Sequence, residues 1–317
     1  MRKAALLYNP DSGGSKQRQR ELQSALTILK LGGVEAELFP TESREHAGEV
    51  ARASIAAGCD TVFACGGDGT INNIAQFLAT TPVALGILPI GTANALAHDL
   101  RIPRNIPAAA KAALSAQPRR IAVGRISCCD LHGCSAARYF VIAAGIGVDA
   151  HLFYKLVAAT KQRHGMAAYY AKAWHMWFSY PMTRFRVKYS DSESREQQAD
   201  VTEMLAVRIR DFGGVVRELA PGASLDRNDL RLILCRTASR LDYLTYVARS
   251  LLGVSWKVPG IDLISAAKVS CSYIPEQSAS KIYVEADGEL IGSLPAEISM
   301  VPDALTLLAP PRNTGRN

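Results

Sequence analysis

The chain has 317 residues, 48% of them hydrophobic and 21% charged, and a formal net charge of +7. This composition predicts a soluble globular protein with one large domain or two ordinary ones. No apolar run approaches the roughly 18 residues of a membrane span, and the apolar stretch behind Arg2 and Lys3 ends at Tyr8, too soon for a signal peptide. We therefore expect a cytoplasmic protein whose charge favours phosphates, nucleic acid or an anionic membrane as partner.

Residues 1–125 alternate apolar strands with helical patterns, which predicts an α/β domain with a parallel sheet. Leu22, Ala25, Leu26 and Leu29 fall on one face of the first helix. The expected strands are 3–8, 34–39, 60–65 and 83–89, and a second helix is expected over 43–57.

Residues 126–294 read as strands separated by turns, which predicts a second, mainly antiparallel β domain. Phe185 and Val187, for example, alternate with Arg186 and Lys188. The expected strands are 138–147, 184–189, 203–210, 230–235 and 281–286, with helical inserts near 152–178 and 239–253. The apolar residues 295–312 are expected to return to the first domain and complete it.

Seven cysteines in a chain of this length do not make a disulfide framework. Cys128, Cys129, His132 and Cys134 form a local cluster of possible metal ligands. No second ligand pair stands at zinc-like spacing, so a reduced loop is the favoured interpretation.

Three turns of the first domain each follow an apolar strand and precede a helix: Asn9–Gly14, Gly66–Thr70 and Pro89–Asn94. Glycines let backbone N–H groups at a helix N-terminus approach phosphate oxygens. Hydroxyl donors are available from Ser12, Thr70 and Thr92. Neither the Walker-type nor the dinucleotide fingerprint is present. Because all three turns are expected at one edge of the sheet, they predict a nucleotide phosphate site.

Asp68 is the one carboxylate within the glycine turn Gly66–Thr70. An anion site seldom includes a carboxylate unless a divalent metal or a hydroxyl proton is also bound. Asp68 therefore indicates phosphoryl chemistry, and the alternative is a turn stabiliser similar to an N-cap.

Six segments carry a family resemblance. "YNPDSGG", "CGGDGTINNIAQFL" and "LPIGTANALAHDL" lie in the first domain, and "AAGIGVDAHL", "APGASLDRNDLRLIL" and "VEADGELIGSLPAEISMVPDALTLLAP" follow in the second. In this order they resemble the diacylglycerol kinase catalytic domain family, which includes sphingosine kinases and the bacterial YegS-like lipid kinases. The resemblance covers most of the chain.

The resemblance implies that the second domain is a β-sandwich and that ATP binds with Mg²⁺ in a cleft between the two domains. Mg²⁺ is expected at Asp68. The nucleotide-side residues implied by position are Asn9, Ser12, Gly13, Thr41, Gly66, Gly67, Asp68, Gly69, Thr70, Gly91, Thr92 and Asn94.

The resemblance also implies that Asp287 and Glu289 are catalytic together with Asp68. From spacing alone, Asp287-Gly288 is a hairpin turn signal. Asp149 resembles an acidic residue near the lipid head group in sphingosine kinases, and it is equally suited to cap a following helix.

Two positions depart from the family pattern. Asn73 stands where many members have Glu, so Asp68 or water must replace any metal ligand there. Asp226-Arg227-Asn228-Asp229 replaces an acidic pair before a glycine, and Asp226 is the remaining candidate metal ligand of that loop.

The segment Ala150–Tyr189 has seven basic residues and ten aromatic residues, and it has no Asp or Glu. Ala167, Tyr170, Trp174 and Trp177 fall on one helical stripe. The stripe is either core or a surface that docks transiently on an anionic membrane.

The motifs together predict an ATP-dependent lipid kinase that phosphorylates a hydroxyl of a membrane lipid and associates peripherally with the membrane. The acceptors left open are diacylglycerol, phosphatidylglycerol, sphingoid bases and other prenyl or acyl lipids. One alternative is a kinase for a soluble acceptor, similar to NAD kinases, and another is a non-catalytic nucleotide- or lipid-binding relative. Nucleic acid is not an expected partner, because it would explain the charge and none of the carboxylates.

Overall fold

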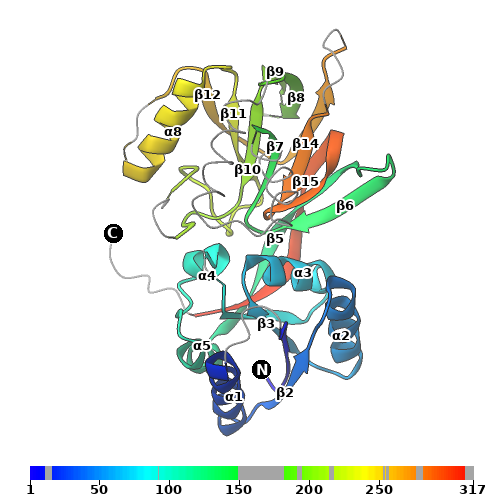
Figure 1. Ribbon diagram of the computed structural model, residues 1–317, viewed down its shortest axis with the longest axis vertical. Helices are drawn as coiled ribbons and strands as arrows, with labels where there is room; N and C mark the ends of the chain where they lie inside the picture. Colours follow the sequence, from blue (N-terminus) through cyan, green and yellow to red (C-terminus); the bar gives the residue numbers. More distant parts are fainter. Residues whose placement is uncertain are drawn as a thin grey trace. The chain divides into compact units, whose positions relative to one another are not determined.

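The computed structural model describes residues 1–10, 16–91, 93–148, 182–190, 195–213, 218–252, 254, 257–275 and 281–310. The chain divides into two compact units. Unit 1 consists of Met1–Val123, Asp211–Gly214 and Pro302–Asn317, and unit 2 of Gly124–Arg210 and Val215–Val301. Two strands, β5 (Gln117–Cys129) and β15 (Glu289–Ala309), contribute residues to both units. Figure 1 shows the helices of unit 1 around its sheet and the strands that dominate unit 2.

Unit 1 contains a parallel sheet in the order β2-β1-β3-β4-β15. Its first four strands are β1 (Lys3–Tyr8), β2 (Glu35–Pro40), β3 (Thr61–Gly66) and β4 (Ala84–Pro89). Every residue of β3 and β4 is buried, which explains their continuous apolar sequence. The end of β15 joins parallel to β4 with Thr306 opposite Ala84. The predicted parallel α/β sheet is confirmed.

Helices cover both faces of this sheet: α1 (Lys16–Leu31) packs against α5 (Ile106–Leu114), and α2 (Arg44–Ala56) packs against α3 (Asp68–Leu78) (Figure 1). A short helix, α4 (Ala95–Asp99), follows β4. Two helices begin where a side chain accepts a backbone N–H, because Ser43 caps α2 and Asn105 caps α5.

Unit 2 is built from two antiparallel runs of strands, in the orders β12-β11-β10-β7-β14-β15 and β15-β13-β8-β9. β15 takes part in both, because Glu289–Ser293 pairs with β14 and Ala296–Ser299 pairs with β13. The elements are β6 (Ser135–Phe140), β7 (Ala143–Gly147), β8 (Phe185–Ser190), β9 (Glu196–Val201), β10 (Glu203–Val207), β11 (Leu230–Cys235), α8 (Arg240–Leu252), β12 (Ile261–Ala266), β13 (Lys268–Tyr273) and β14 (Tyr283–Ala286).

Both runs contribute side chains to one hydrophobic core of unit 2. Ile146 and Met204 come from the first run, and Phe185, Val187 and Val269 come from the second. Phe185, Val187 and Val269 alternate with more exposed residues, as expected for strands with one buried face, whereas β7 and β10 are buried at almost every position. The predicted mainly antiparallel second domain is confirmed. Within the described ranges, no helix is long and apolar enough to cross a membrane.

The predicted strand 138–147 is two strands in the structure, β6 and β7. Between them, the N–H groups of Val141 and Ile142 bind the Asp287 carboxylate instead of a strand neighbour. The predicted strand 203–210 ends at Val207, and the Arg208 N–H that follows donates to the Ile142 carbonyl at 2.9 Å. The predicted helical insert 152–178 lies outside the described residues.

Gly86 in β4 offers a test of the unit 1 core. A Cβ at this position would lie 2.4 Å from the ring of Phe63, which is fully buried. We expect Gly86→Ala to lower the free energy of unfolding by about 1–3 kcal/mol, because the core is overpacked. Gly69→Ala is the control, because open space surrounds that position. Equal urea midpoints for the two variants would contradict this packing.

Candidate active site

The predicted phosphate turns after β3 and β4 contact each other through their glycines. The Ile90 N–H donates to the Gly66 carbonyl at 2.9 Å. A Cβ on Gly91 would lie 2.6 Å from the Gly67 Cα, a distance that real side chains do not adopt. The two turns can therefore meet only as bare backbone, which leaves their N–H groups accessible to a ligand at the carboxyl edge of the sheet.

Asp68 is the first residue of α3 and connects this helix to α4. Its N-cap is Gly67, which supplies no side-chain hydrogen bond to the helix. The Asp68 Oδ1 instead accepts the Leu96 N–H at the start of α4, at 3.4 Å. The carboxylate is half-buried, and Gly69 beside it is exposed with open space around it. This long hydrogen bond leaves the carboxylate able to accept further partners.

Asn94 and Thr41 also lie at the carboxyl ends of strands. The Asn94 backbone is left-handed, with φ 52°, and its Nδ2 donates to the Gly91 carbonyl at 2.6 Å. Its Oδ1 is buried and accepts no hydrogen bond from any residue that the structure describes. The Thr41 hydroxyl donates to the Tyr8 carbonyl at 3.2 Å and so ties β2 to β1. A buried acceptor without a donor suits a ligand that donates one.

Four predicted site residues, Ser12, Gly13, Thr92 and Asp149, lie outside the described residues, as does most of the basic aromatic segment, 150–181. Asn9, Gly66 and Thr70 lie where predicted, at the carboxyl ends of β1 and β3. A Cβ on Gly66 would lie 2.3 Å from the Thr70 hydroxyl, so the turn is closely packed.

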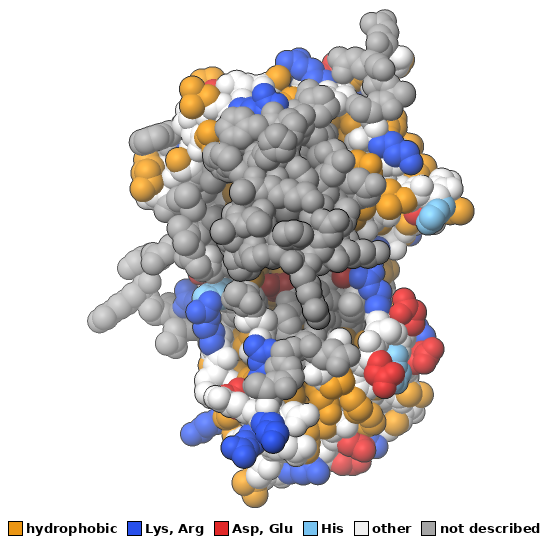
Figure 2. Space-filling view, viewed as in Figure 1, with side chains coloured by type: hydrophobic (Ala, Val, Ile, Leu, Met, Phe, Trp, Pro, Cys, Tyr) orange, Lys and Arg blue, Asp and Glu red, His pale blue; other side chains and the backbone are white. Residues whose placement is uncertain are grey.

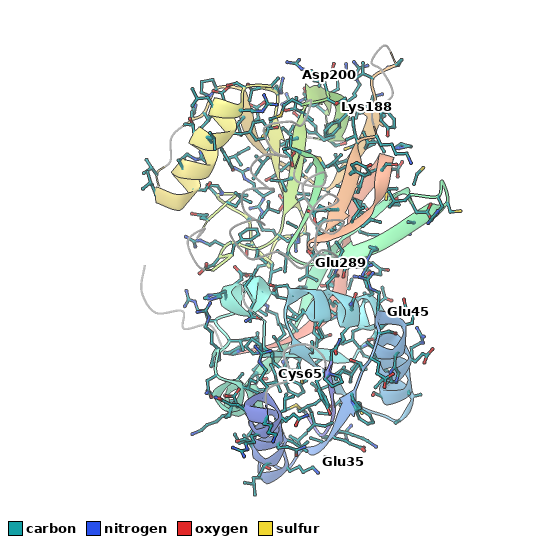
Figure 3. The ribbon with its side chains drawn as sticks, viewed as in Figure 1. Glu35, Glu45, Cys65, Lys188, Asp200 and Glu289 are labelled. Carbon is teal, nitrogen blue, oxygen red and sulfur yellow. The ribbon has the colours of Figure 1, made fainter. Side chains whose placement is uncertain are left out.

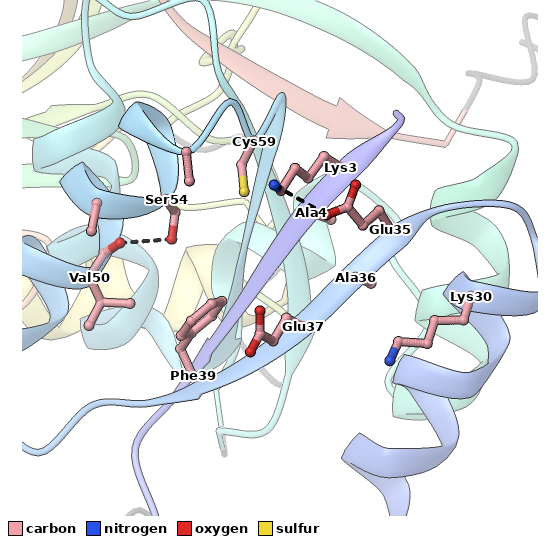
Figure 4. Close-up of a pocket in the computed structure, with 12 residues that line it drawn as sticks. Lys3, Ala4, Lys30, Glu35, Ala36, Glu37, Phe39, Val50, Ser54 and Cys59 are labelled. Carbon is pink, nitrogen blue, oxygen red and sulfur yellow. Dashed lines mark hydrogen bonds and ion pairs between the residues drawn. The ribbon is translucent and has the colours of Figure 1, made fainter.

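Two pockets of unit 1 are lined by different parts of its strands. One, of about 510 Å³, is lined by Lys3 and Glu35 at the starts of β1 and β2, by Phe39 further along β2, by Cys59 just before β3 and by Val50 of α2 (Figure 4). Ligands of parallel α/β sheets bind at the opposite, carboxyl edge. The other, of about 650 Å³, lies beside Tyr8 at the carboxyl end of β1 and is lined by basic residues of α1, Lys16 and Arg20.

Asp287 and Gly288 form the two-residue turn between β14 and β15. Both have positive φ, 49° and 79°, as a type I′ hairpin requires. The Asp287 side chain accepts three backbone N–H groups, from Val141 at 2.9 Å, Ile142 at 2.9 Å and Ala143 at 3.0 Å. The hairpin interpretation is therefore confirmed, and the carboxylate fixes the break between β6 and β7. Its catalytic role stays a prediction.

Two further carboxylates accompany this hairpin. Glu289, at the start of β15 (Figure 3), pairs with Arg138 at 3.0 Å. Glu285 is 3% exposed and accepts the Gly288 N–H at 2.8 Å. The sequence analysis missed Glu285. Its position between the apolar residues Val284 and Ala286 was a signal for it, and both neighbours are buried in the structure.

Glu203 is a buried carboxylate beside the segment that resembles the family's Gly-x-Gly-x-Asp motif. It accepts the Val148 N–H, and a Cβ on Gly147 would lie 3.2 Å from its Oε2. Its neighbour Thr202 shares a 2.7 Å hydrogen bond with the Tyr243 hydroxyl. Burial raises the pKa of Tyr243 well above its usual value, so this hydroxyl stays protonated. Glu203 was also missed by the sequence analysis.

The loop with the predicted metal ligand Asp226 is held by a buried arginine. Arg208 is fully buried, and its guanidinium donates to the carbonyls of Arg227 at 2.8 Å, Asp229 at 2.7 Å and Leu225 at 3.4 Å. Burial lowers its pKa to about 10, so it stays charged at neutral pH. Carbonyl oxygens that could serve a metal are thus bound to a cation of the chain itself.

Asp226 and Asp229 have different surroundings in this loop. Asp226 is exposed beside Ser224, and its N–H donates to the Ser224 hydroxyl at 3.2 Å. Asp229 accepts the Arg227 Nε at 2.6 Å. Burial raises the pKa of Asp229, but the hydrogen bonds from Arg227 outweigh burial, so its pKa is lowered. The role of Asp226 as a metal ligand stays a prediction.

The cysteine cluster forms a hairpin loop. Asp130 Oδ1 accepts the His132 and Cys134 N–H groups, each at 2.8 Å. Burial raises the pKa of Cys128 to about 11, which keeps this thiol protonated. In the part of the chain that the structure describes, no three potential metal-ligating side chains of His, Cys, Asp or Glu gather. The interpretation as a reduced loop stays a prediction.

Comparisons with known proteins cover nearly the whole chain. Residues 3–126 match the family model described as diacylglycerol kinase catalytic domain, and residues 141–309 match the model described as YegS C-terminal NAD kinase beta sandwich-like domain. A diacylglycerol kinase of Bacillus subtilis is 28% identical over 94% of this chain and 93% of its own length. One of Staphylococcus saprophyticus is 26% identical over 98% of this chain and 96% of its own length.

Solved structures show the same fold. The structure of a diacylglycerol kinase from Bacillus anthracis has a TM-score of 0.71 and 18% identity over 98% of this chain and 97% of its own. Yeast NADH kinase complexed with NADH is more distant, with a TM-score of 0.53 and 10% identity over 98% of this chain and 84% of its own. At these identities the likeness concerns the fold alone.

Arg208 offers a test of the loop at 225–229. We expect Arg208→Met to lower the free energy of unfolding by about 3 kcal/mol or more, because it leaves buried carbonyls without donors. Arg208→Lys keeps the charge and loses less. Arg210→Met is the control, because Arg210 is largely exposed. Urea unfolding measures all three, and equal losses for the two Met variants would exclude this role of Arg208.

Asp287→Asn should reduce stability as well as any activity. An amide group in place of one carboxylate oxygen would face a backbone N–H, so we expect a loss of about 2 kcal/mol. Asp68→Asn, with a single long hydrogen bond at stake, should keep the wild-type unfolding midpoint. If both variants unfold like the wild type, the Asp287 carboxylate does not hold the break between β6 and β7.

Proposed function

The chain belongs to the family that joins a diacylglycerol kinase catalytic domain to a YegS C-terminal NAD kinase beta sandwich-like domain, and from this premise we propose that it is an ATP-dependent lipid kinase. It transfers the γ-phosphate of ATP to a hydroxyl of a membrane lipid of the diacylglycerol type. The structural observation that carries this proposal is the contact of Gly67 with Gly91, which bares two turns at the carboxyl edge of the unit 1 sheet.

These turns fit the phosphates of ATP. The N-terminus of α3 has no side-chain cap, so its first N–H groups are available to an anion. Gly69 is exposed with open space around it, which allows phosphate oxygens to come close. The buried Asn94 Oδ1 suits a hydrogen-bond donor of the nucleotide or its water.

The carboxylates fit Mg²⁺ and the acceptor hydroxyl. When bound, Mg²⁺ neutralises phosphate charge and ATP supplies the phosphoryl group. Asp68 would hold the metal, because a half-buried carboxylate with one long hydrogen bond is the ligand type that Mg²⁺ prefers. Asp287 and Glu289 remain the candidates beside the acceptor hydroxyl. The three N–H groups bound by Asp287 favour a positioning role for it.

A lipid acceptor places the reaction at a membrane surface. The net charge of +7 favours an anionic bilayer. We therefore include peripheral membrane association, with the enzyme on the cytoplasmic side, in the proposal.

The first experiment is transfer of labelled γ-phosphate from ATP and Mg²⁺ to diacylglycerol, phosphatidylglycerol and a sphingoid base in mixed micelles, with NAD in parallel. We expect label on a lipid. Asp68→Asn should lower the rate by about two to three orders of magnitude, while the exposed control Asp303→Asn stays near wild type. Label on NAD alone would replace the proposal with a soluble-acceptor kinase.

A further inference from the structure

Arg208 is a basic residue in the interior of unit 2. Figure 2 shows Lys and Arg side chains at separate places on the surface, where water surrounds them. Arg208 has no such contact with water, because it is 0% exposed. Among the charged residues that the structure describes, it is the most completely buried. A buried charge is unfavourable unless other groups of the protein compensate it, so the surroundings of Arg208 must supply negative charge.

The compensating groups are backbone carbonyls of one short loop. The Arg208 Nη1 donates to the carbonyls of Arg227 at 2.8 Å and Asp229 at 2.7 Å. Its Nη2 donates to the carbonyl of Leu225 at 3.4 Å. The loop 225–229 therefore turns alternate carbonyls toward one guanidinium. Backbone carbonyls that converge in this way are a common part of cation sites in proteins.

Two carboxylates of the same loop add negative charge. Burial lowers the pKa of Arg208 to about 10, so the guanidinium stays charged at neutral pH. The charges of Asp229 and Asp226 act against burial and favour the charged form. Carbonyl and carboxylate oxygens are the ligands that Ca²⁺ and Mg²⁺ bind in proteins. The loop thus has the composition of a site for a divalent cation.

The guanidinium occupies the space that a metal in this loop would need. Ca²⁺ binds its oxygen ligands at about 2.3–2.6 Å, and the Arg208 Nη1 already lies 2.8 Å and 2.7 Å from two of the carbonyl oxygens. A divalent ion beside this group would meet a fixed positive charge in surroundings of low dielectric constant. A second cation of the chain, Arg227, donates to the Asp229 carboxylate through its Nε at 2.6 Å. The loop therefore does not fit an additional metal.

Arg208 also connects this loop to the hairpin of Asp287. Its backbone N–H donates to the Ile142 carbonyl at 2.9 Å, and the Ile142 N–H donates to the Asp287 Oδ1 at 2.9 Å. The side chain and the backbone of one residue thus join the loop 225–229 to the break between β6 and β7. We expect loss of the cation from the loop to disturb the Asp287 hairpin as well.

We propose that the Arg208 guanidinium is a built-in cation that takes the place of a divalent metal in the loop 225–229, so that this loop binds no metal and Asp226 is not a metal ligand. The stability of the loop is then independent of divalent cations. The consequence for catalysis rests on the proposed function: Mg²⁺ is needed as the ion that accompanies ATP, and no second metal at this loop supports the reaction.

Equilibrium dialysis of the full-length chain against labelled Ca²⁺, without nucleotide, tests the wild-type loop. The free Ca²⁺ concentration is about 1 mM, which fills even weak Ca²⁺ sites of proteins. Asp226→Asn is the matched variant, because it removes the exposed carboxylate of the loop and leaves Arg208 in place. We expect both proteins to bind the same amount of Ca²⁺, and Ca²⁺ at any other carboxylate is common to both. Loss of a bound Ca²⁺ from Asp226→Asn would overturn the proposal.

Removal of the guanidinium should turn the loop into a site for an added metal. Arg208→Ala leaves carbonyls without a donor, so we expect a lower thermal unfolding midpoint, which the same Ca²⁺ concentration should raise again by about 2 °C. Arg210→Ala is the control, because the Arg210 side chain is 74% exposed. Ca²⁺ should leave the midpoints of wild type and Arg210→Ala unchanged, and NaCl of equal ionic strength controls for salt.

The double variant Arg208→Ala/Asp226→Asn should lose the response to Ca²⁺. An Arg208→Ala midpoint that Ca²⁺ leaves unchanged would overturn the proposal, and so would a response that persists in the double variant. If Arg208→Ala does not fold, the dialysis of wild type against Asp226→Asn decides the question by itself.

Kinetics separate this inference from the proposed function. In an active enzyme, a higher Mg²⁺ concentration for the half-maximal rate in Asp226→Asn than in wild type would overturn the proposal, because it would reveal a metal at the loop. A wild type that phosphorylates no acceptor refutes the proposed function. Dialysis and unfolding midpoints still decide the role of Arg208 in that case, since neither measurement needs catalysis.

Discussion

The close approach of Gly67 and Gly91 is the constraint on which the candidate phosphate site of unit 1 depends. Neighbouring parallel strands bring the turns after β3 and β4 side by side, and the bond between Ile90 and Gly66 joins them. A side chain at Gly91 would force the turns apart, and one at Gly67 would lie 3.2 Å from the Gly91 Cα and would require a small shift. The start of α3, and with it Asp68, would then move relative to α4. Glycine matters at these two positions because it has no side chain, and the predicted site residues beside them take their positions from that contact.

In unit 2, by contrast, carboxylate side chains bind backbone N–H groups that have no partner in a strand. Where the chain breaks between β6 and β7, the N–H groups are bound by the Asp287 carboxylate, and the Val148 N–H is bound by Glu203. A carboxylate that fills such a position excludes an anionic ligand from it. The two units therefore differ in electrostatic character: unit 1 leaves donors open for an anion, and unit 2 presents buried acids.

The sheet of unit 1 could be predicted from the sequence because its determinants are local. Continuous apolar runs identified β3 and β4, and the glycines after them identified the turns. Asp68 could be singled out for the same reason, since it stands between two such glycines. The hydrogen bond that Asp68 accepts from the Leu96 N–H could not be predicted, because nothing in the sequence at the start of α4 indicates which side chain will accept that N–H.

The missed residues of unit 2 depend on distant backbone. Arg208 reads as one more basic residue at a strand end, yet its acceptors are carbonyls 17 to 21 residues further along the chain. The break at Val141 and Ile142 has its cause in Asp287, 144 to 146 residues later. Carbonyl and N–H groups are the same in every residue, so a pattern of side chains cannot reveal which of them will be bound.

The strand β15 has a consequence for how the protein is made. Its last part, from Pro302 onward, is the strand that lies beside β4 in the sheet of unit 1, and it is synthesised after all of unit 2. At ordinary elongation rates, roughly ten seconds or more pass between the emergence of Val123 and that of the strand. Throughout this interval β4 has an open edge, with apolar residues and unpaired N–H and C=O groups that another chain could pair with. The nascent chain is therefore most prone to misassembly before the last part of β15 is synthesised, and we expect a chaperone to bind it at the ribosome.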